Sequence, residues 1–272
     1  MDTLKAQRIP QQMKVMTFNI RIDAEEDGIN HMENRKARVL DVIKRESPDV
    51  IGFQEVLDHR RDWLRAALAP EYVFLGGGRE TDYRGEACPV AYRASKFELI
   101  GMETFWLSDT PDVAGSRYEH VKQSLLPRYA IAIRLKHHNV DESILFVNTH
   151  LDHRYPTARR AAFEQLAEYL QSKKGIGVLV GDFNAQPASD EVKYFVEHTA
   201  QLGYRDTTDK IQTTFHGFGA EEAQVKIDYV FTNAEVVESH AVEDLPVNGV
   251  YCSDHYPISV TLELWAPAVF LV

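Results

Sequence analysis

Short apolar runs of strand length recur along this chain, and several of them end in a polar or acidic side chain. The run 14–20 contains Asn19, the run 49–54 is followed by Glu55, and the run 175–181 is followed by Asp182. Runs this short, rich in valine, isoleucine and phenylalanine, are typical of strands buried in a sheet. Because rigid sheets present functional groups at their strand ends, the pattern predicts a sheet-based fold in which these polar residues are candidates for function.

Segments with helical spacing of apolar residues separate the strand-like runs. The spacing predicts helices over residues 33–46, 59–68 and 156–172, the first of which stops before Pro48. We predict further strands over residues 72–75, 88–92, 99–107, 130–135, 143–149, 226–232, 236–242 and 256–264. Strands and helices mixed through the whole length predict an α/β fold of mixed α+β character, with two sheets packed face to face and helices outside.

The chain has 272 residues, a length that α/β folds often use for one domain. No long repeat, low-complexity tract or Pro/Gly/Ser-rich linker divides it. We therefore expect residues 1–13 to be a polar N-terminal extension and residues 14–272 to form a single domain.

Composition and charge restrict the classes of partner. An apolar content of 44% with 26% charged residues is typical of a soluble globular protein. The formal net charge of −11 argues against tight nonspecific binding to nucleic acid, although a local basic groove can coexist with an acidic whole. Residues 1–13 lack the apolar region of a secretory signal, and no segment has the roughly 18 apolar residues of a membrane span. We expect a cytoplasmic monomer in which Cys88 and Cys252 are free thiols.

The tripeptide Asp182-Phe183-Asn184 is the first candidate for chemistry. Its carboxylate and carboxamide are two residues apart in an extended segment, so both point to one side and can hold the same water or phosphate oxygen. An Asx turn that closes the strand explains the same tripeptide equally well. The motif therefore needs support from other residues.

Two histidine motifs adjoin other apolar runs, namely Asn148-Thr149-His150 and Ser253-Asp254-His255. An imidazole binds a phosphoryl oxygen or transfers a proton near neutral pH, and a carboxylate beside it binds a hard cation. Asp228 lies at the start of another apolar run, where a buried acid needs a partner such as a histidine ring. Each residue alone is explained by a structural or surface position, but together they indicate a site.

In their order along the chain, these motifs resemble those of the endonuclease/exonuclease/phosphatase superfamily, which includes DNase I-like nucleases, inositol phosphatases, sphingomyelinases and deadenylases. The resemblance covers residues 14 to about 262 and rests on Thr17-Phe18-Asn19, Gln54-Glu55, Asn148-Thr149-His150, Gly181-Asp182-Phe183-Asn184, Ile227-Asp228-Tyr229 and Ser253-Asp254-His255. It implies a four-layer sandwich, in which two mainly antiparallel sheets pack face to face between outer helices, with the active site at one edge.

The resemblance also implies a metal site and a hydrolytic water. Asn19, Glu55 and Asp254 would surround Mg²⁺ or Mn²⁺, because hard divalent ions prefer oxygen ligands. Asp182, together with Asn184, would orient the attacking water and help to deprotonate it. Whether the site holds one metal ion or two stays open.

The two histidines have implied roles in binding the phosphoryl group. His150 and His255 would contact its oxygens as charge builds in the transition state, and Asp228 would orient the His255 ring. By the same logic Glu86 would pair with His150, although a solvated loop glutamate is nearly as good an interpretation. His255 acting as the base instead is an alternative that the sequence leaves open.

Further residues are candidates for substrate contact on weaker grounds. The segments 105–111 and 214–218 resemble those of a subgroup of bacterial hydrolases, and their aromatic side chains would either line a leaving-group pocket or belong to the core. Basic and acidic loop residues near the motifs would either contact the substrate or face solvent. These candidates are Trp106, His216, Phe218, Arg128 and Asp152.

We therefore predict divalent-metal-dependent hydrolysis of a phosphodiester or phosphomonoester in a small molecule, lipid head group or nucleotide. The alternative is a nuclease acting on RNA or single-stranded DNA, which the net acidity disfavours. A catalytically inactive binding module is the rival from another class. It is disfavoured because every expected residue type is present, and binding alone does not require all of them.

Overall fold

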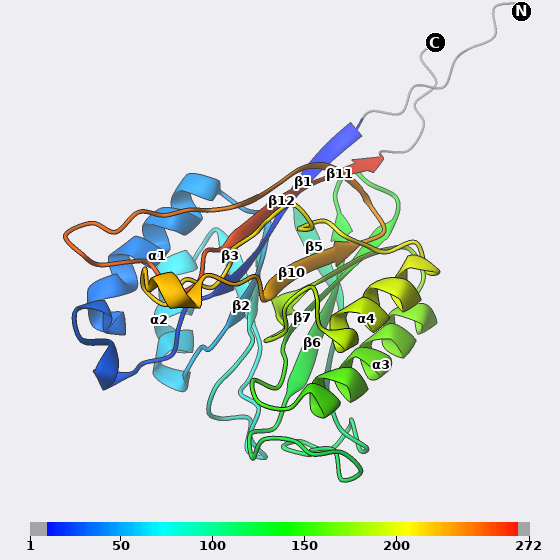
Figure 1. Ribbon diagram of the computed structural model, residues 1–272. Coiled ribbons are helices and arrows are strands. Elements are labelled where there is room, and N and C mark those ends of the chain that lie inside the picture. The colour runs from blue at the N-terminus through cyan, green and yellow to red at the C-terminus, as the bar shows by residue number, and fades with distance from the viewer. Residues whose placement is uncertain (1–9, 266–272) are drawn as a thin grey trace, which may run out of the picture.

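The computed structural model describes residues 10–265, which form two six-stranded sheets (Figure 1). The first sheet has the order β11-β12-β1-β2-β4-β3, with β1 Pro10–Asn19, β2 Val50–Gln54, β3 Tyr72–Leu75, β4 Val90–Arg93, β11 Glu235–Ala241 and β12 Ile258–Trp265. The second has the order β5-β6-β7-β8-β10-β9, with β5 Phe97–Trp106, β6 Tyr129–His137, β7 Ser143–His150, β8 Ile176–Asp182, β9 Arg205–Asp206 and β10 Asp228–Thr232.

Each sheet contains one parallel pair of strands, and its other neighbouring strands are antiparallel. In the first sheet β1 and β2 are parallel, and α1 (Met32–Glu46) lies between them in the chain. In the second sheet β7 and β8 are parallel, and α3 (Pro156–Ser172) connects them. The prediction of two mainly antiparallel sheets is confirmed. The parallel pairs matter because parallel neighbours end at the same edge of a sheet.

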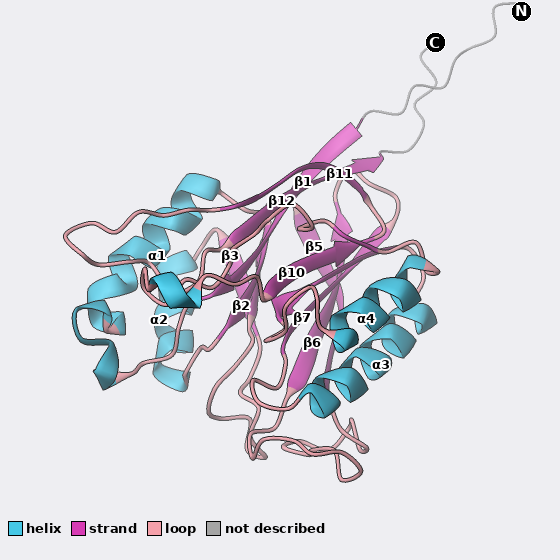
Figure 2. Cartoon of the chain, viewed as in Figure 1, coloured by secondary structure: helices cyan, strands magenta, loops and turns pink. Residues whose placement is uncertain are grey.

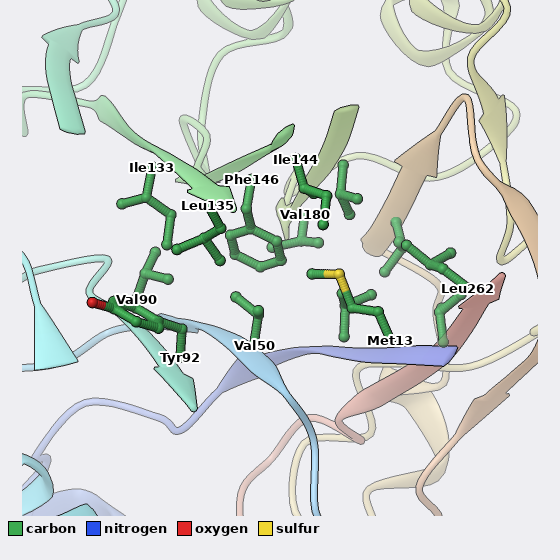
Figure 3. Close-up of a cluster of buried hydrophobic side chains, with 14 of the residues drawn as sticks. Met13, Val50, Val90, Tyr92, Ile133, Leu135, Ile144, Phe146, Val180 and Leu262 are labelled. Carbon is green, nitrogen blue, oxygen red and sulfur yellow. The ribbon is translucent and has the colours of Figure 1, made fainter. Parts of the chain in front are cut away.

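Three separate apolar clusters divide the molecule into four layers (Figure 2). The cluster between the sheets contains side chains from both of them, and Figure 3 labels Met13, Val50, Val90, Tyr92, Ile133, Leu135, Ile144, Phe146, Val180 and Leu262. A second cluster joins the first sheet to α1 and α2 (Asp58–Leu68), and a third joins the second sheet to α3 and α4 (Asp190–Ala200). In Figure 1 the two helix pairs lie on opposite sides of the sheets. The four-layer sandwich is therefore confirmed.

Some predicted boundaries were wrong. The first strand begins at Pro10 instead of residue 14, because residues 10–13 pair with the far end of β12. Part of the predicted polar extension is thus strand, and residues 1–9 lie outside the described residues. The helix α4 was not predicted at all, although Val192, Phe195 and Thr199 have helical spacing and are buried. Two 3₁₀ segments, Glu25–Asn30 and Glu221–Ala223, were also missed.

In the part of the chain that the structure describes, no helix combines the length and apolarity that crossing a bilayer requires. Both cysteines are buried and free, as predicted.

A polar bridge crosses the apolar layer between the sheets. The side-chain amide of Gln54 on β2 donates to Asn148 Oδ1 on β7 (2.7 Å) and to Thr17 Oγ1 on β1 (3.1 Å). Asn148 Nδ2 in turn faces the carbonyl oxygens of Phe53 (2.8 Å), Cys88 (3.1 Å) and Pro89 (3.2 Å). The bridge needs a glycine at position 52, since a Cβ there would lie 2.7 Å from the Asn148 carboxamide. It sets the relative position of β2 and β7 close to their carboxyl ends.

Replacing Asn148 with alanine should lower the free energy of unfolding by about 2–4 kcal/mol. The change leaves buried backbone carbonyls and the Gln54 amide without their partner and opens a small cavity. Urea unfolding followed by circular dichroism measures the loss. The exposed Asn139→Ala is the control and should change the unfolding free energy by less than about 0.5 kcal/mol. Equal stability of the two variants would show that the bridge contributes nothing.

Candidate active site

The parallel strand pairs bring four predicted site residues to one edge of the sandwich. In the first sheet, Asn19 is the last residue of β1 and Glu55 follows the end of β2. In the second sheet, His150 ends β7 and pairs in register with Asp182, which ends β8. Side chains from both sheets then meet, since Asn19 Nδ2 lies 3.0 Å from both Glu55 Oε1 and Asp182 Oδ2.

Two antiparallel strands complete the set. Asp228 is the first residue of β10 and lies opposite Asp182 in the register of the second sheet. Asp254 and His255 precede β12, whose antiparallel pairing with β1 places the start of β12 beside the end of β1. The Ser253 hydroxyl donates to the Asn19 carbonyl oxygen at 2.7 Å and fastens this loop to the first strand. Eight residues predicted to bind the metal or to take part in catalysis therefore lie together: Asn19, Glu55, His150, Asp182, Asn184, Asp228, Asp254 and His255.

Asp182 is at the centre of the cluster and only 1% exposed. Its Oδ1 accepts from the Asn184 backbone N–H (2.8 Å), so the Asx turn weighed as an alternative is present. Its Oδ2 lies 3.5 Å from His150 Nε2 and 3.8 Å from His255 Nε2. Burial, followed by the negative charge of Asp228, raises the pKa of Asp182 above its ordinary value. A carboxylate with a raised pKa beside two imidazoles can accept a proton from water.

The glycine before Asp182 explains how this carboxylate reaches the centre. A Cβ at Gly181 would lie 2.0 Å from the Thr149 carbonyl oxygen, and the residue has a φ of 153°. Only glycine permits this approach between β7 and β8.

Glu55, Asn19 and Asp254 form the oxygen-rich side of the cluster. Glu55 adopts a φ of 63°, a conformation that is costly for a residue with a side chain, and its Oε2 accepts from the Ile22 backbone N–H (2.8 Å). Burial raises the pKa of Asp254, and the nearby charge of Glu55 raises it further against the opposing effect of His255. Arg21, which the sequence reasoning missed, lies with Nε 3.7 Å from Asp254 Oδ2 and is paired with Asp27.

The donor set fits a hard divalent cation. Glu55, His150 and Asp182 each offer one ligand atom, and these atoms lie within 4.8 Å of one another. Asn19 Nδ2 lies between two carboxylates and its Oδ1 accepts from the Arg21 backbone N–H, so the amide would turn over to offer its oxygen to a cation. Burial disfavours the ionised form of Asp182 and Asp254, and a bound cation would stabilise that form. Carboxylate and amide oxygens are the ligands that Mg²⁺ and Mn²⁺ prefer.

His255 is held by Asp228, with 2.8 Å between Nδ1 and Oδ2. Burial opposes the charge of the ring, but Asp228 and then Asp254 and Asp182 outweigh it and raise the pKa of His255 to about 10. Because this folded-state pKa exceeds the unfolded value of about 6.5, the pair stabilises the protein fully below pH 6.5. The contribution is lost as the pH rises through about 10. At neutral pH His255 is therefore a cation, and its Nε2 lies 3.8 Å from Asp182 Oδ2.

His150 has the partner that was predicted for it. Its Nδ1 lies 3.2 Å from Glu86 Oε1, and its Nε2 faces the Asn184 amide nitrogen at 2.8 Å. Burial opposes the ionisation of Glu86, yet contact with His150 and the charges of Arg79 and Arg128 lower the pKa of Glu86 to about 2. Because an amide nitrogen can only donate, Nε2 accepts from Asn184, whereas Nδ1 lies near Glu86 without a hydrogen bond of full geometry.

Several weaker candidates do not lie in the cluster as substrate-facing groups. Trp106 is 2% exposed, stacks on Tyr129 and donates its indole N–H to the Arg79 carbonyl oxygen, so it packs in the interior. Asp152 accepts from the backbone N–H groups of Ser124, Arg154 and Tyr155, which explains it as a turn residue.

Arg128 and His216 are likewise buried. Arg128 lies behind His150, with Nη1 3.4 Å from its carbonyl oxygen. His216 stacks on Tyr256 with ring centroids 4.1 Å apart, and burial lowers its pKa to about 4. Phe218 is half-buried beside Tyr251. Of the weaker candidates, Glu86 approaches the ring of His150 and Arg128 its backbone carbonyl oxygen.

Paired acids and histidines around a buried oxygen-rich centre define a class of hydrolase that acts on phosphoesters. Residues 16–255 match the model of the Endonuclease/Exonuclease/phosphatase family, so the chain belongs to this family, as its motifs predicted. Members of the family are phosphoesterases, and the chain is an enzyme of this kind.

Solved structures and one curated relative are similar over most of the chain. An endonuclease/exonuclease/phosphatase from Bacteroides vulgatus is 32% identical with a TM-score of 0.84, covering 93% of this chain and 99% of that one. The mannosyl-6-phosphatase of Bacteroides thetaiotaomicron is 26% identical with a TM-score of 0.79, covering 91% and 98%. An uncharacterized protein of Acanthamoeba polyphaga mimivirus is 25% identical, in an alignment that covers 92% of this chain and 100% of the relative.

Replacing Asp228 with asparagine should lower the pKa of His255 by at least about one unit in the metal-free protein, because the negative charge that most raises this pKa is removed. Titration of the histidine ring signals by NMR measures this pKa. The exposed His138 is an internal control whose titration should not change. An unchanged pKa of His255 in the variant would contradict the assignment of Asp228 as the group that keeps this ring protonated.

Proposed function

We propose that this protein is a divalent-metal-dependent hydrolase of a small phosphomonoester, with Mg²⁺ or Mn²⁺ as the metal. The observation that carries the proposal is the position of Asp182, whose Oδ2 is within 4 Å of Asn19, His150 and His255. This arrangement joins an oxygen-rich cation site to two imidazoles across one carboxylate.

Asn19, Glu55 and Asp254 would hold the metal, with Asp182 nearby. When bound, the cation supplies Lewis-acid polarisation of a phosphoryl oxygen and neutralises charge that accumulates there. Asp182 orients the hydrolytic water and accepts its proton, since its pKa is raised and its Oδ2 faces the centre of the cluster. The backbone N–H of Asn184 donates to the Asp182 carboxylate, and its side-chain amide lies against the His150 ring.

The two histidines have different partners, and the roles that we assign to them differ accordingly. The Asp228 carboxylate favours the protonated form of His255, and this ring binds a phosphoryl oxygen as a charged donor. We therefore assign His255 as an oxyanion ligand and not as the base. His150 is positioned by Glu86 on one nitrogen and Asn184 on the other. Its contact with substrate is expected to replace the Asn184 hydrogen bond.

Two observations support a small substrate. A structure to which this chain is similar over 91% of its length is that of a mannosyl-6-phosphatase, whose name specifies a small phosphomonoester. The formal charge of −11 offers little attraction for a polyanion, whose repeated phosphates need lysine or arginine contacts.

The first test of this function is a substrate panel with controlled metal. The purified protein, stripped with chelator, should show no hydrolysis of sugar phosphates, and added Mg²⁺ or Mn²⁺ should restore phosphate release. Small phosphodiesters, single-stranded RNA and single-stranded DNA are the alternative substrates in the same assay. Full activity in excess chelator would contradict metal dependence, and higher kcat/KM on RNA or DNA would identify a nuclease instead.

Single substitutions test the assigned roles. Glu55→Gln and His255→Ala should each lower kcat/KM by more than about 100-fold with little change in the circular dichroism spectrum, because each removes a group that acts on the transition-state charge. The exposed Glu222→Gln and His138→Ala are matched controls expected to keep wild-type rates. Near wild-type turnover in Glu55→Gln or His255→Ala would refute the role of that residue.

A further inference from the structure

Arg35, in the first turn of α1, is 0% exposed and hydrogen-bonds only to backbone carbonyl oxygens. Within residues 10–265, no carboxylate oxygen lies within 4.0 Å of its guanidinium nitrogens, so no ion pair accounts for this buried charge. The ring of Phe218 lies 5.7 Å from its Cζ. A buried cation without an acid partner is costly and requires a reason.

The carbonyl oxygens that Arg35 contacts belong to two connections beside the oxygen-rich side of the site, the one between β1 and α1 and the loop before β12. Its Nη1 donates to Ile20 (2.6 Å), the residue after Asn19, and to Cys252 (3.0 Å), two residues before Asp254. Its Nη2 donates to Arg21 (3.2 Å), and its Nε donates to Asn30 in the first 3₁₀ segment. One guanidinium therefore ties together the segments that carry Asn19 and Asp254.

We propose that Arg35 is a positioning residue for the metal-binding side chains, holding the loop after β1 and the loop before β12 at the separation that a divalent cation requires. This inference rests on the metal-dependent function proposed above. Nη1 bridges the two loops directly, and the hydrogen bond from Ser253 to the Asn19 carbonyl oxygen is a second, independent tie between them.

The chemistry of the side chain accounts for arginine at this position. A planar guanidinium offers five N–H donors in a fixed fork, which suits carbonyl oxygens arriving from several directions. A lysine keeps the charge but has a single nitrogen, so it cannot reach the same set of oxygens. Arg35→Lys therefore removes the geometric constraint while retaining a cation near Asp254.

Mn²⁺ binding in the absence of substrate tests the proposal, measured by the EPR signal of free Mn²⁺. The wild type should bind Mn²⁺ at a saturable site, Arg35→Lys should bind it about tenfold more weakly, and Ser253→Ala should show a smaller loss. The control is Arg93→Lys, because Arg93 also joins separate segments through Pro48 and Ser47 but lies far from the site in the fold. This control should bind Mn²⁺ as the wild type does.

Steady-state kinetics separates positioning from a general loss of structure. At saturating Mn²⁺ the Arg35→Lys enzyme should recover a kcat within about threefold of the wild type, because only the metal site is affected. Unchanged Mn²⁺ affinity in both Arg35→Lys and Ser253→Ala would overturn the proposal and leave the metal-dependent function intact. A kcat that saturating Mn²⁺ does not restore would also overturn it. A wild-type protein without a saturable Mn²⁺ site would refute the proposed function and this inference together.

Discussion

The hydrogen bond between Gln54 and Asn148 is the contact on which the geometry of the site depends. It crosses a layer in which the two sheets meet mainly through apolar side chains, with the Asn19–Asp182 hydrogen bond as a second polar contact at the site. Directional bonds inside a low-dielectric core specify one arrangement, because any other leaves buried polar groups unpaired. The bridge lies one residue before Glu55 and two residues before His150, so it fixes the two strand ends that approach across the sandwich.

This fixed arrangement of the strand ends holds several negative charges close together, although they repel one another. Asp182, Asp228 and Asp254 are all buried, and burial raises the pKa of Asp182 and Asp254. Only part of the compensating charge comes from the protonated ring of His255 and from Arg21. A cluster that is short of positive charge and rich in oxygen atoms is suited to a divalent cation. The cost of assembling the site is thus connected with its chemistry.

Much of the site was predictable from sequence because its residues lie at strand ends, where a polar side chain directly follows an apolar run. Asn19, Glu55, His150 and Asp182 could be found in this way, and the order of the motifs then predicted the family and the four-layer fold. The pairing of Glu86 with His150 was also predicted, and the two side chains are in contact.

The sequence was less informative wherever a role depends on tertiary contacts. Arg35 lies in an ordinary helical segment among other charged residues, and only the fold shows that its guanidinium meets carbonyl oxygens from two connections far apart in the chain. Trp106 was a candidate for a pocket because aromatic residues serve both as core and as binding surface, and its burial against Tyr129 could not be read from local sequence. The helix α4 was missed although Ser189 at its N-cap and the acids Asp190 and Glu191 in its first turn are usual start signals.

The two histidines lie beside different sets of charged groups. Beside His255 and Glu55, the buried groups are mainly carboxylates, which suit a bound cation. Behind His150, two buried arginines, Arg79 and Arg128, lie beside the carboxylate of Glu86, so cations are present on this side together with acids. A phosphoryl group placed between them would have its oxygens near positive groups on both sides once a metal is bound. Charge that develops on those oxygens would then be stabilised by groups that the fold already holds in place, without reorganisation during the reaction.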